Sequence, residues 1–416
     1  MMGGIFKLIV CYLRNWESFF LIEDNEYFWS AMKIWQIDPA NITPYYDIAL
    51  CHALASENQQ VRFISSRFLY DKTLVYPDTF TTDFRYFRLL EDERLLHFPR
   101  LRKGMRALTY PITHRGLLRD IKHHKPDIVH FQWSRLPIFD RWLIAQIRAL
   151  GIPVVHTIHD VDPLFGQGYF TGELKDVYEQ VDALVVHTKD SQDQFLSTYQ
   201  SIPPSKVHII PILTMDDPNM PADASLKSAR EKLKIHPNAF VSMFFGGIKY
   251  YKGIDILANA IPLVHEKNPE VQFWIVGRPD MDQLDLLNQL RKKENVVIVA
   301  DYVPSELAWQ YFLSADIHVF PYRHIFQSGA LISTLGYGCA VIVTDVGGLP
   351  ELVDGNGWVV PPEDPQALAE AICNAAEDRD QLKRMGQRSR EIVITRTSPA
   401  HVASEYIKLY ESLVTR

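Results

Sequence analysis

Residues 336–372 read GYGCAVIVTDVGGLPELVDGNGWVVPPEDPQALAEAI, and this stretch decides the fold. The apolar run Val341–Thr344 favours a buried strand, because it is short and rich in β-branched residues. A glycine loop, Thr344–Glu351, follows it, and Trp358–Val360 predicts the next strand. Residues 365–376 then predict a helix. Strand, loop and helix in this order are typical of a parallel sheet with helical crossovers.

The same alternation runs through the rest of the chain. In the first half the predicted strands are Lys33–Ile37, Val61–Ser65, Ile128–Gln132, Val154–Ile158, Ala183–His187 and Val207–Ile210. In the second half they are Phe240–Phe245, Val271–Val276, Val296–Val299, Ile317–Phe320, Val341–Thr344 and Trp358–Val360. Helices are expected between them, among them Tyr45–Ala55, Arg141–Leu150, Pro365–Ala376 and Ala400–Leu413.

Segment 213–226, rich in proline and acidic residues, interrupts the pattern and predicts a linker. We therefore expect an α/β protein with two doubly wound, Rossmann-like domains, 32–212 and 227–398, facing across a cleft. Residues 399–416 predict a helix that crosses back to the first domain, and residues 1–31 form an N-terminal extension. Ligands of such sheets bind beyond the carboxyl ends of the strands, so the residues that follow each strand are the candidates for a site.

The composition narrows the class of protein. The chain has 416 residues, of which 47% are hydrophobic and 22% charged, as in a soluble globular protein of two or three domains. Its net charge of −7 argues against a nucleic-acid partner. The four cysteines lie far apart with no CxxC pair, which fits neither a zinc site nor a disulfide framework. We expect a reducing, cytoplasmic compartment.

Two segments stand apart from the strand–helix pattern. Ile5–Leu13 is apolar but too short to span a membrane. Residues 1–31 stay open between an accessory helix, sequence upstream of the natural start, and membrane contact. Residues 94–125 carry nine Lys or Arg against the single acidic residue Asp120. Such a block predicts either peripheral contact with an anionic surface, such as the inner leaflet of the membrane, or a solvated basic helix.

Three loops of the second half follow predicted strands and contain glycine. Phe245–Gly253 carries Lys249 and Lys252, which suit a diphosphate. Ser328 and Gly329 stand where the next helix should begin, and a helix N-terminus attracts anions. The third loop is Thr344–Glu351. Each loop alone is also consistent with an ordinary turn, but three at one edge predict a phosphate-binding face.

The first half offers polar and aromatic candidates at its own strand ends. His159 and Asp160 follow the strand Val154–Ile158 and should reach the cleft. Trp133 follows Ile128–Gln132 and could pack a flat face against a sugar. Structural roles, as a satisfied buried histidine and a core aromatic residue, stay open for both.

Three segments together resemble the retaining glycosyltransferases of family four, which have the GT-B fold: FFGGIKYYKGIDIL (244–257), ADYVPSELAWQYFLSADIHVFPY (300–322) and residues 336–372. The match is strong over Phe240–Glu377 and is traceable from Met32 through DIVHFQW, VVHTIHD and ALVVHTK. It implies transfer of a sugar from a nucleotide diphosphate-sugar to a glycan or lipid-linked acceptor, in polysaccharide or glycolipid assembly. It also implies retention at the anomeric carbon without a metal or cofactor, because lysines and a helix N-terminus would carry the diphosphate's charge.

The resemblance also implies roles for individual residues. The expected diphosphate site is Gly247, Lys249, Lys252, Ser328, Gly329 and Ala330, and the base site is Arg278, Tyr302 and Val303. The expected catalytic residues are His159 and Asp160, where His159 would orient the sugar and relay or stabilise charge. No metal ligand is expected.

The sequence departs from the family in three places. The family's loop arginine aligns near Gly247, and Lys249 would take its role. Most members carry two glutamates eight residues apart, and the aligned positions here are Ile325 and Ser333. Candidates to contact the donor sugar or ribose instead are Arg323, His324, Gln327, Ser333 and Glu351. The first-half glycine loop is replaced by residues 39–44, which leaves Asn41 and Thr43, together with Trp133, as acceptor-side candidates.

The sequence is also consistent with three other functions. The missing glutamates are consistent with a non-catalytic, nucleotide-sugar-binding partner subunit. A nucleotide-sugar epimerase or a phosphorolytic enzyme would share the fold, but an epimerase should show acidic catalytic residues in the cleft that the sequence does not reveal. A Rossmann dehydrogenase is disfavoured, because no GxGxxG follows an early strand.

Overall fold

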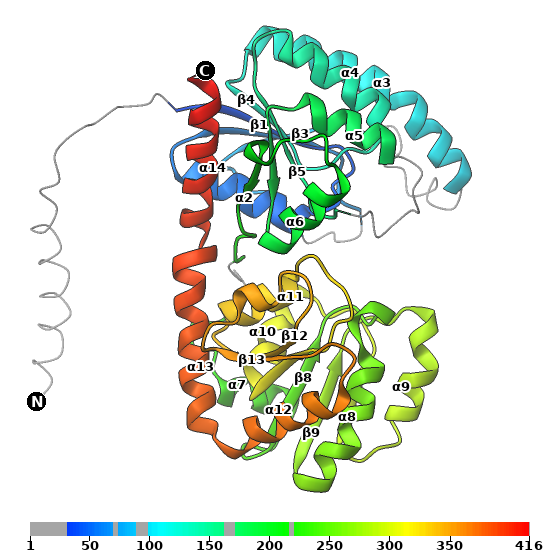
Figure 1. Ribbon diagram of the computed structural model, residues 1–416, viewed down its shortest axis with the longest axis vertical. Coiled ribbons are helices and arrows are strands. Elements are labelled where there is room, and N and C mark those ends of the chain that lie inside the picture. The colour runs from blue at the N-terminus through cyan, green and yellow to red at the C-terminus, as the bar shows by residue number, and fades with distance from the viewer. Residues whose placement is uncertain (1–30, 70–73, 89–98, 162–170, 216–219, 416) are drawn as a thin grey trace, which may run out of the picture.

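The computed structural model describes residues 31–69, 74–88, 99–161, 171–215 and 220–415, except for the side chains of 99–103 and 171. It contains two α/β units stacked along the long axis of the molecule (Figure 1). The alternatives weighed for the N-terminal extension fall on residues 1–30, outside the described part, as do residues 94–98 of the basic stretch.

The first unit is built on a seven-stranded sheet in the order β3-β2-β1-β4-β5-β6-β7, with every pair parallel. The strands are β1 (Lys33–Asp38), β2 (Gln60–Ser65), β3 (Thr81–Phe84), β4 (Ile128–Phe131), β5 (Val154–Thr157), β6 (Ala183–Val186) and β7 (Val207–Ile209). The helices are α2 (Pro44–Ser56), α3 (Pro99–His124), α4 (Pro137–Arg148), α5 (Thr171–Gln180) and α6 (Lys189–Thr198).

The second unit is built on a six-stranded parallel sheet in the order β10-β9-β8-β11-β12-β13. The strands are β8 (Phe240–Phe245), β9 (Val271–Val276), β10 (Val296–Val299), β11 (Ile317–Phe320), β12 (Ala340–Thr344) and β13 (Gly357–Val360). The helices are α7 (Leu226–Leu233), α8 (Ile254–Lys267), α9 (Leu284–Leu290), α10 (Ser305–Ser314), α11 (Gly329–Gly336), α12 (Pro365–Glu377) and α13 (Arg379–Ile392).

These two sheets confirm the predicted fold class and all twelve predicted strands, with ends that match or shift by one residue. The central strands β4, β5 and β6 are buried at every position, as expected where helices cover both faces of a sheet. The sequence analysis missed β3, because Thr-Thr-Asp-Phe at the sheet edge is short and mostly polar. Period and apolarity carry little signal in such a strand.

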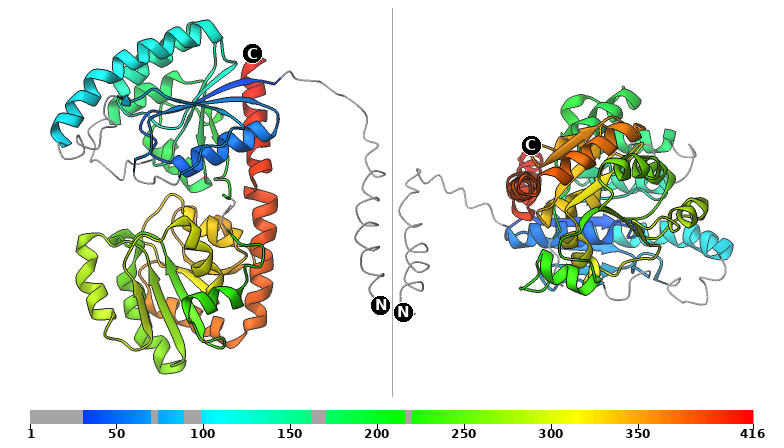
Figure 2. Two further views of the ribbon diagram at one scale, coloured as in Figure 1. Left: turned by 180° about the vertical axis from the view of Figure 1, so that it is seen from behind. Right: turned by 90° about the horizontal axis from the view of Figure 1, so that it is seen from below.

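The chain crosses between the units twice. After β7 it enters the second unit, and after α13 it returns through a π-helical turn, Val393–Thr397, into α14 (Pro399–Val414). The last two helices line one side of both units, α13 beside the second and α14 beside the first (Figures 1 and 2). The buried face of α14, including Tyr406 and Tyr410, packs with α2 and the first sheet. The two crossings are bonded to each other, because Thr214 N donates to Thr397 O at 2.7 Å.

The basic stretch contributes the long helix α3, whose inner face is fixed to α4. His114 Nε2 lies 3.0 Å from Asp140 Oδ1, and Tyr110 Oη donates to the same oxygen at 2.6 Å. All three side chains are fully buried. The opposite face of α3 is exposed. Within the described residues, no helix combines the length and apolarity needed to cross a membrane.

A buried ion pair fixes α7 to the second sheet. The Arg230 guanidinium donates to Asp316 at 2.7 Å and to the carbonyl oxygens of Ser314 and Pro237, and Arg230 is only 2% exposed. Asp316 also accepts from Val241 N, at the start of β8. The pair therefore ties the helix to the start of two neighbouring strands.

We expect Arg230→Met to destabilise the second unit by about 3–5 kcal/mol, because it leaves the Asp316 carboxylate buried without its main partner. Urea unfolding followed by tryptophan fluorescence measures the effect. Lys383→Met is the matched control, since it removes an ion pair that is about three-quarters exposed and should leave the midpoint unchanged. Equal shifts in the two variants would contradict the importance assigned to the buried pair.

Candidate active site

The turn after β8 meets the start of α11 at the carboxyl edge of the second sheet. A Cβ atom on Gly246 would lie 3.5 Å from Lys252 Nζ and 3.8 Å from Ala330 Cβ. Glycine at this position therefore leaves the backbone open between a lysine and a helix N-terminus. The glycine loops after two predicted strands, about eighty residues apart in the chain, predicted this juxtaposition.

Lys252 is held in place by aromatic side chains. Its Nζ donates to Tyr322 Oη at 3.1 Å and lies 4.7 Å from the centre of that ring. Burial opposes the charge, but Tyr322 and Tyr251 leave the pKa of Lys252 above its usual value, so the side chain is cationic at neutral pH. The next residue must be glycine, since Gly253 has φ +66° and a Cβ there would lie 1.9 Å from Pro321 O.

The first turn of α11 has the features of an anion site. Ser328 is the N-cap, and its Oγ accepts from Leu331 N at 3.2 Å. The N–H groups of Gly329 and Ala330 have no partner inside the helix, because the first N–H groups of any helix lack one. Tyr322 Oη lies 3.5 Å from Ser328 Oγ and so connects Lys252 to the cap.

Lys249 lines a pocket that is open to solvent and that Lys252 does not line. With Gly247, Arg278, Pro279, Asp280 and Met281 it lines a volume of about 470 Å³. The structure thus brings Lys249 together with the base candidate Arg278 and separates it from Lys252. The other base candidates do not line this pocket: Tyr302 is 57% exposed, and Val303 is partly buried against the core beside β8.

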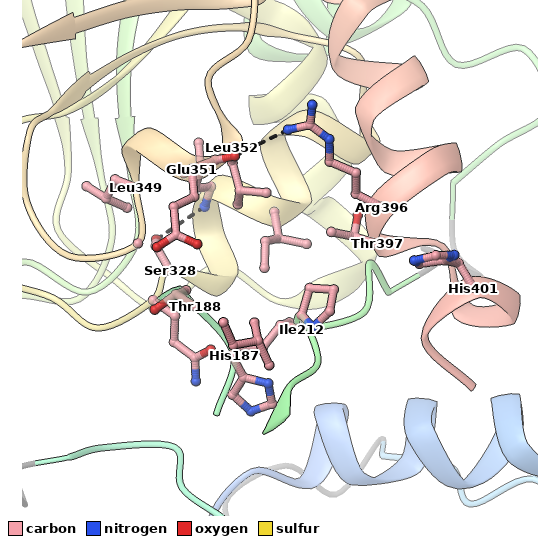
Figure 3. A pocket seen from close by; sticks show the side chains of 16 residues that line it. His187, Thr188, Ile212, Ser328, Leu349, Glu351, Leu352, Arg396, Thr397 and His401 are labelled. Carbon is pink, nitrogen blue, oxygen red and sulfur yellow. Dashed lines mark hydrogen bonds between the residues drawn. The ribbon is translucent and has the colours of Figure 1, made fainter. Parts of the chain in front are cut away.

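A cavity of about 300 Å³ lies between the two units (Figure 3). Glu351, Ser328 and Thr188 lie on one side of it, and Arg396, Thr397 and His401 on the other. His187 and Ile212 of the first unit also line it, as does Gln327 of the second. This cavity collects residues from the end of β6, the start of α11 and the returning chain.

The candidates to replace the missing glutamates occupy different environments. Both carboxylate oxygens of Glu351 accept N–H groups at the start of α6, from Lys189 and Asp190, at 3.0 Å each. Gln327 also contacts the first unit, because its Nε2 lies 3.4 Å from His159 O. His324 is exposed, and Ser333 is half-buried on α11. Arg323 is tied to Asp255 and Glu363 within its own unit, which commits it to a structural role.

His159 lies at the end of β5 inside a set of rings. It stacks on Trp133 with ring centres 4.9 Å apart, and Tyr46 lies edge-on to it. Burial, followed by the neighbouring His187, lowers the pKa of His159 well below its usual value, so the ring is neutral at pH 7. Burial also raises the pKa of the adjacent Asp160 to about 6.

The acceptor-side candidates are bonded among themselves. Trp133 Nε1 donates to Thr43 Oγ1 at 3.0 Å, and Thr43 Oγ1 donates to Asp47. Asn41 is buried, and its Nδ2 donates to Ser66 O and Tyr76 Oη. Trp133 and Thr43 thus lie together next to His159, whereas the amide N–H groups of Asn41 are committed to neighbouring chain segments.

The sequence analysis missed two groups that build this region. Tyr322 holds Lys252, and His187 contacts His159, with His187 Nε2 3.3 Å from His159 Nδ1. Tyr322 lies just beyond the predicted strand Ile317–Phe320, and His187 is the last residue of the predicted strand Ala183–His187. Inspection of every polar residue at or just beyond a strand end would have found them. Among the described residues, no three His, Cys, Asp or Glu side chains are grouped in a way that could hold a metal ion.

Both units match family models. Residues 239–378 match Glycosyl transferases group 1, and residues 48–212 match Glycosyltransferase Family 4. The chain is 27% identical over 290 residues to alpha-maltose-1-phosphate synthase from Mycolicibacterium smegmatis, covering 63% of this chain and 74% of that protein. It is 28% identical over 298 residues to D-inositol 3-phosphate glycosyltransferase from Streptomyces avermitilis, covering 65% of this chain and 63% of that protein.

Solved structures share the arrangement at low identity. Anabaena Alr3699/HepE in complex with UDP-glucose superposes with a TM-score of 0.70 at 16% identity, over 92% of this chain and all of that one. The catalytic domain of starch synthase IV from Arabidopsis thaliana, bound to ADP and acarbose, gives 0.71 at 15% identity, over 93% of this chain and all of that one. At such identities the likeness shows the fold. With both units matched by the two family models, the chain belongs to the family-four, group 1 glycosyltransferases and has the GT-B fold.

Proposed function

We propose that this glycosyltransferase transfers a sugar from a nucleotide diphosphate-sugar to a glycan or lipid-linked acceptor, with retention at the anomeric carbon and without a metal. The observation that carries the proposal is the meeting of Gly246, Lys252 and the start of α11. A fixed ammonium and two helical N–H groups around an open backbone suit the two charges of a diphosphate leaving group.

The donor's path follows from the positions of the charged groups. Lys252, Ser328, Gly329 and Ala330 would bind the phosphate nearest the sugar. Lys249 lines the open pocket together with Gly247 and Arg278, whereas Lys252 does not line it, so we place Lys249 toward the nucleoside end. Tyr302 and Val303 would approach the base only from outside this pocket.

The transferred sugar would lie toward the first unit. His159 and Asp160 form that side, and Gln327 already reaches His159 O from the second unit. Both ring nitrogens of His159 are hydrogen-bonded within the first unit, so its neutral ring would shape the sugar site, and Asp160, with a pKa of about 6, can accept hydrogen bonds from sugar hydroxyls near neutral pH. His324 and Ser333 stay candidates for sugar or ribose contacts. Glu351 could join them only by leaving the start of α6.

On the acceptor side, Trp133 and Thr43 lie next to His159 and could contact an incoming sugar or lipid-linked glycan. Trp133 is flat against His159 on one face, and its N–H is used by Thr43, so packing rather than hydrogen bonding is its available contribution. Asn41 would act through the shape of the loop, whose backbone it fixes at φ +52°.

Thermal-shift measurements with UDP-, GDP-, ADP- and CDP-sugars test the donor site. One nucleotide class should raise the melting temperature of the wild type, because a ligand that binds only the native state stabilises it. Lys252→Met should weaken that binding about tenfold or more, since a charge-assisted contact is lost. Lys292→Met, at an exposed lysine of the same unit, is the matched control.

Two outcomes would count against the proposed donor site. If Lys252→Met kept the full shift, the diphosphate would not bind at this lysine. If no nucleotide sugar shifted the wild type at millimolar concentration, the substitution of both glutamates would mean more than we propose. In that case the non-catalytic partner subunit becomes the better interpretation, and the absence of slow donor hydrolysis would support it.

With the responding α-linked nucleotide sugar and an accepted acceptor, the product should carry an α linkage. The one-bond carbon–proton coupling constant at the anomeric position, from the NMR spectrum of the product, measures this directly. Because Lys252 and α11 would neutralise the leaving diphosphate, the rate in EDTA should stay within about twofold of the rate with added Mg²⁺. A β-linked product would refute retention, and a rate abolished by EDTA and restored by Mg²⁺ would refute metal independence.

We also propose that α3 contacts an anionic membrane surface. Two apolar side chains on its outer face are largely exposed, Leu108 at 72% and Ile112 at 66%. Arg115, Arg119 and Lys122 are exposed on the same helix. An apolar strip flanked by cations matches the boundary between acyl chains and anionic headgroups. The neighbouring α4 adds the exposed side chains of Ile138 and Trp142.

Co-flotation with vesicles of phosphatidylcholine containing 30% phosphatidylglycerol, about a third anionic lipid, tests this contact. The wild type should float with these vesicles but not with pure phosphatidylcholine, and Leu108→Glu/Ile112→Glu should remain at the bottom of the gradient. Ile394→Glu, at another exposed apolar residue far from α3 in sequence, should float like the wild type. Wild type that stays at the bottom with anionic vesicles would refute the membrane contact and leave α3 as a solvated basic helix.

A further inference from the structure

A chain of buried hydrogen bonds runs from the C-terminal helix to the cleft. Gln36 Nε2 lies 3.1 Å from Tyr410 Oη, and Gln132 Nε2 lies 2.8 Å from Gln36 Oε1. Gln132 Oε1 lies 3.1 Å from His159 Nε2. Every one of these side chains is at least nine-tenths buried, and the residues come from α14, β1 and the ends of β4 and β5.

Beyond His159 the chain continues to a backbone carbonyl. His159 Nδ1 lies 3.3 Å from His187 Nε2, and His187 Nδ1 lies 2.8 Å from Ile210 O. A carbonyl oxygen can only accept, so His187 must carry a proton on Nδ1. If His187 is neutral, its Nε2 carries no proton and must accept the hydrogen bond from His159 Nδ1. His159 must then donate from Nδ1, which leaves its own Nε2 without a proton.

This requirement fixes the two glutamines as well. Because Nε2 of His159 carries no proton, it needs a donor, so Gln132 must turn its NH₂ group toward it. The oxygen of Gln132 then faces Gln36, so Gln36 must donate to it from its own NH₂ group. A half-turn of each amide achieves this with almost no change in shape, because the oxygen and nitrogen of an amide are nearly the same size. Tyr410 Oη then donates its one proton to the freed Gln36 Oε1, so His130 Nδ1, which lies 2.7 Å from Tyr410 Oη, must donate to that hydroxyl oxygen.

The opposite orientation needs an extra proton. With Gln132 Oε1 facing His159, the imidazole must donate from Nε2 and accept at Nδ1. His187 would then donate from both nitrogens and carry a positive charge. Burial lowers the pKa of His187 to about 4, and burial and His187 together lower the pKa of His159, so the neutral arrangement prevails at pH 7. The titratable groups around the pair are His130, His156 and Tyr46.

We infer that this chain, running in one direction from Tyr410 to Ile210 O, holds His159 as the neutral tautomer with its proton on Nδ1. Gln132 and His187 are positioning residues, because they act on the cleft through His159. For catalysis this inference rests on the proposed role of His159 beside the transferred sugar. The tautomer itself is a property of the free protein and can be measured without any substrate.

Nitrogen-15 NMR of protein labelled at histidine, at pH 7, is the decisive measurement. Both His159 and His187 should show the pattern of a neutral ring protonated at Nδ1, assigned by comparison with His159→Gln and His187→Phe. A proton on Nε2 of His159, or a cationic His187, would overturn the inference whatever the enzyme's activity. The wild-type spectrum decides this even if a variant fails to fold.

His187→Phe adds a test that a purely structural role would not pass. Phenylalanine cannot accept from His159 Nδ1, so His159 should become a mixture of tautomers in the spectrum. With the donor identified above, kcat should fall about five- to tenfold while the donor KM changes less than twofold. Tyr110→Phe, which removes another buried tyrosine hydroxyl bond in the same unit, should leave both the His159 pattern and kcat unchanged.

Different results would refute the proposed function and the inferred tautomer of His159. A protein that transfers sugar but holds His159 protonated at Nε2 refutes the chain and leaves the function standing. A protein with the expected tautomers that binds no nucleotide sugar refutes the function and leaves the chain standing. An unchanged His159 spectrum in His187→Phe would show that the histidine contact does not set the tautomer, and the inference would fall.

Discussion

The parallel pairing of β8 with β11 is the constraint on which the candidate site depends. Parallel neighbours end at the same edge of a sheet, so the loops that follow them must share the space beyond that edge. Lys252 after β8 and Tyr322 and Ser328 after β11 meet there for that reason. Gly253 allows the close approach, since any side chain at this position would collide with Pro321 O. The ammonium is therefore placed by the sheet rather than by the loop alone.

The first unit holds several polar side chains in its interior, between the sheet and the helices that cover it. Gln36 and His130 are buried within β1 and β4, and Gln132 and His159 are buried just after β4 and β5. Each unsatisfied polar group would cost about 1–3 kcal/mol, so every one of them needs a partner. The partners are one another, Tyr410 of α14, which is last in the chain, and Thr157 and His187. The C-terminal helix is thus part of the interior of the first unit, and removing it would leave Gln36 and His130 without Tyr410.

Most strands could be predicted from the sequence, because a central strand that is buried on both faces needs a continuous run of apolar residues. The sequence predicted the glycine loops because they follow those strands. It did not separate Lys249 from Lys252, since a short 3-10 turn, Tyr250–Lys252, rotates one lysine toward Tyr322 and the other toward Arg278. The bonds of Glu351 to α6 and of Gln36 to Tyr410 join residues 162 and 374 positions apart. No local pattern records such contacts, because they exist only once the two units and the last helix have packed.

The hydrogen bond between Thr214 and Thr397 lies where the chain passes out of the first unit and where it returns. Because both passages are fixed to each other, the crossings connect the two units along one line, and the bonds of Glu351 to the start of α6 connect them again at the cavity that Thr397 lines. A rotation of one unit against the other about that line displaces atoms in proportion to their distance from it. The cavity beside Thr397 lies almost on the axis and would change little. The open pocket at Lys249 is lined by residues of the second unit alone, so it would keep its shape and move as a whole in such a rotation.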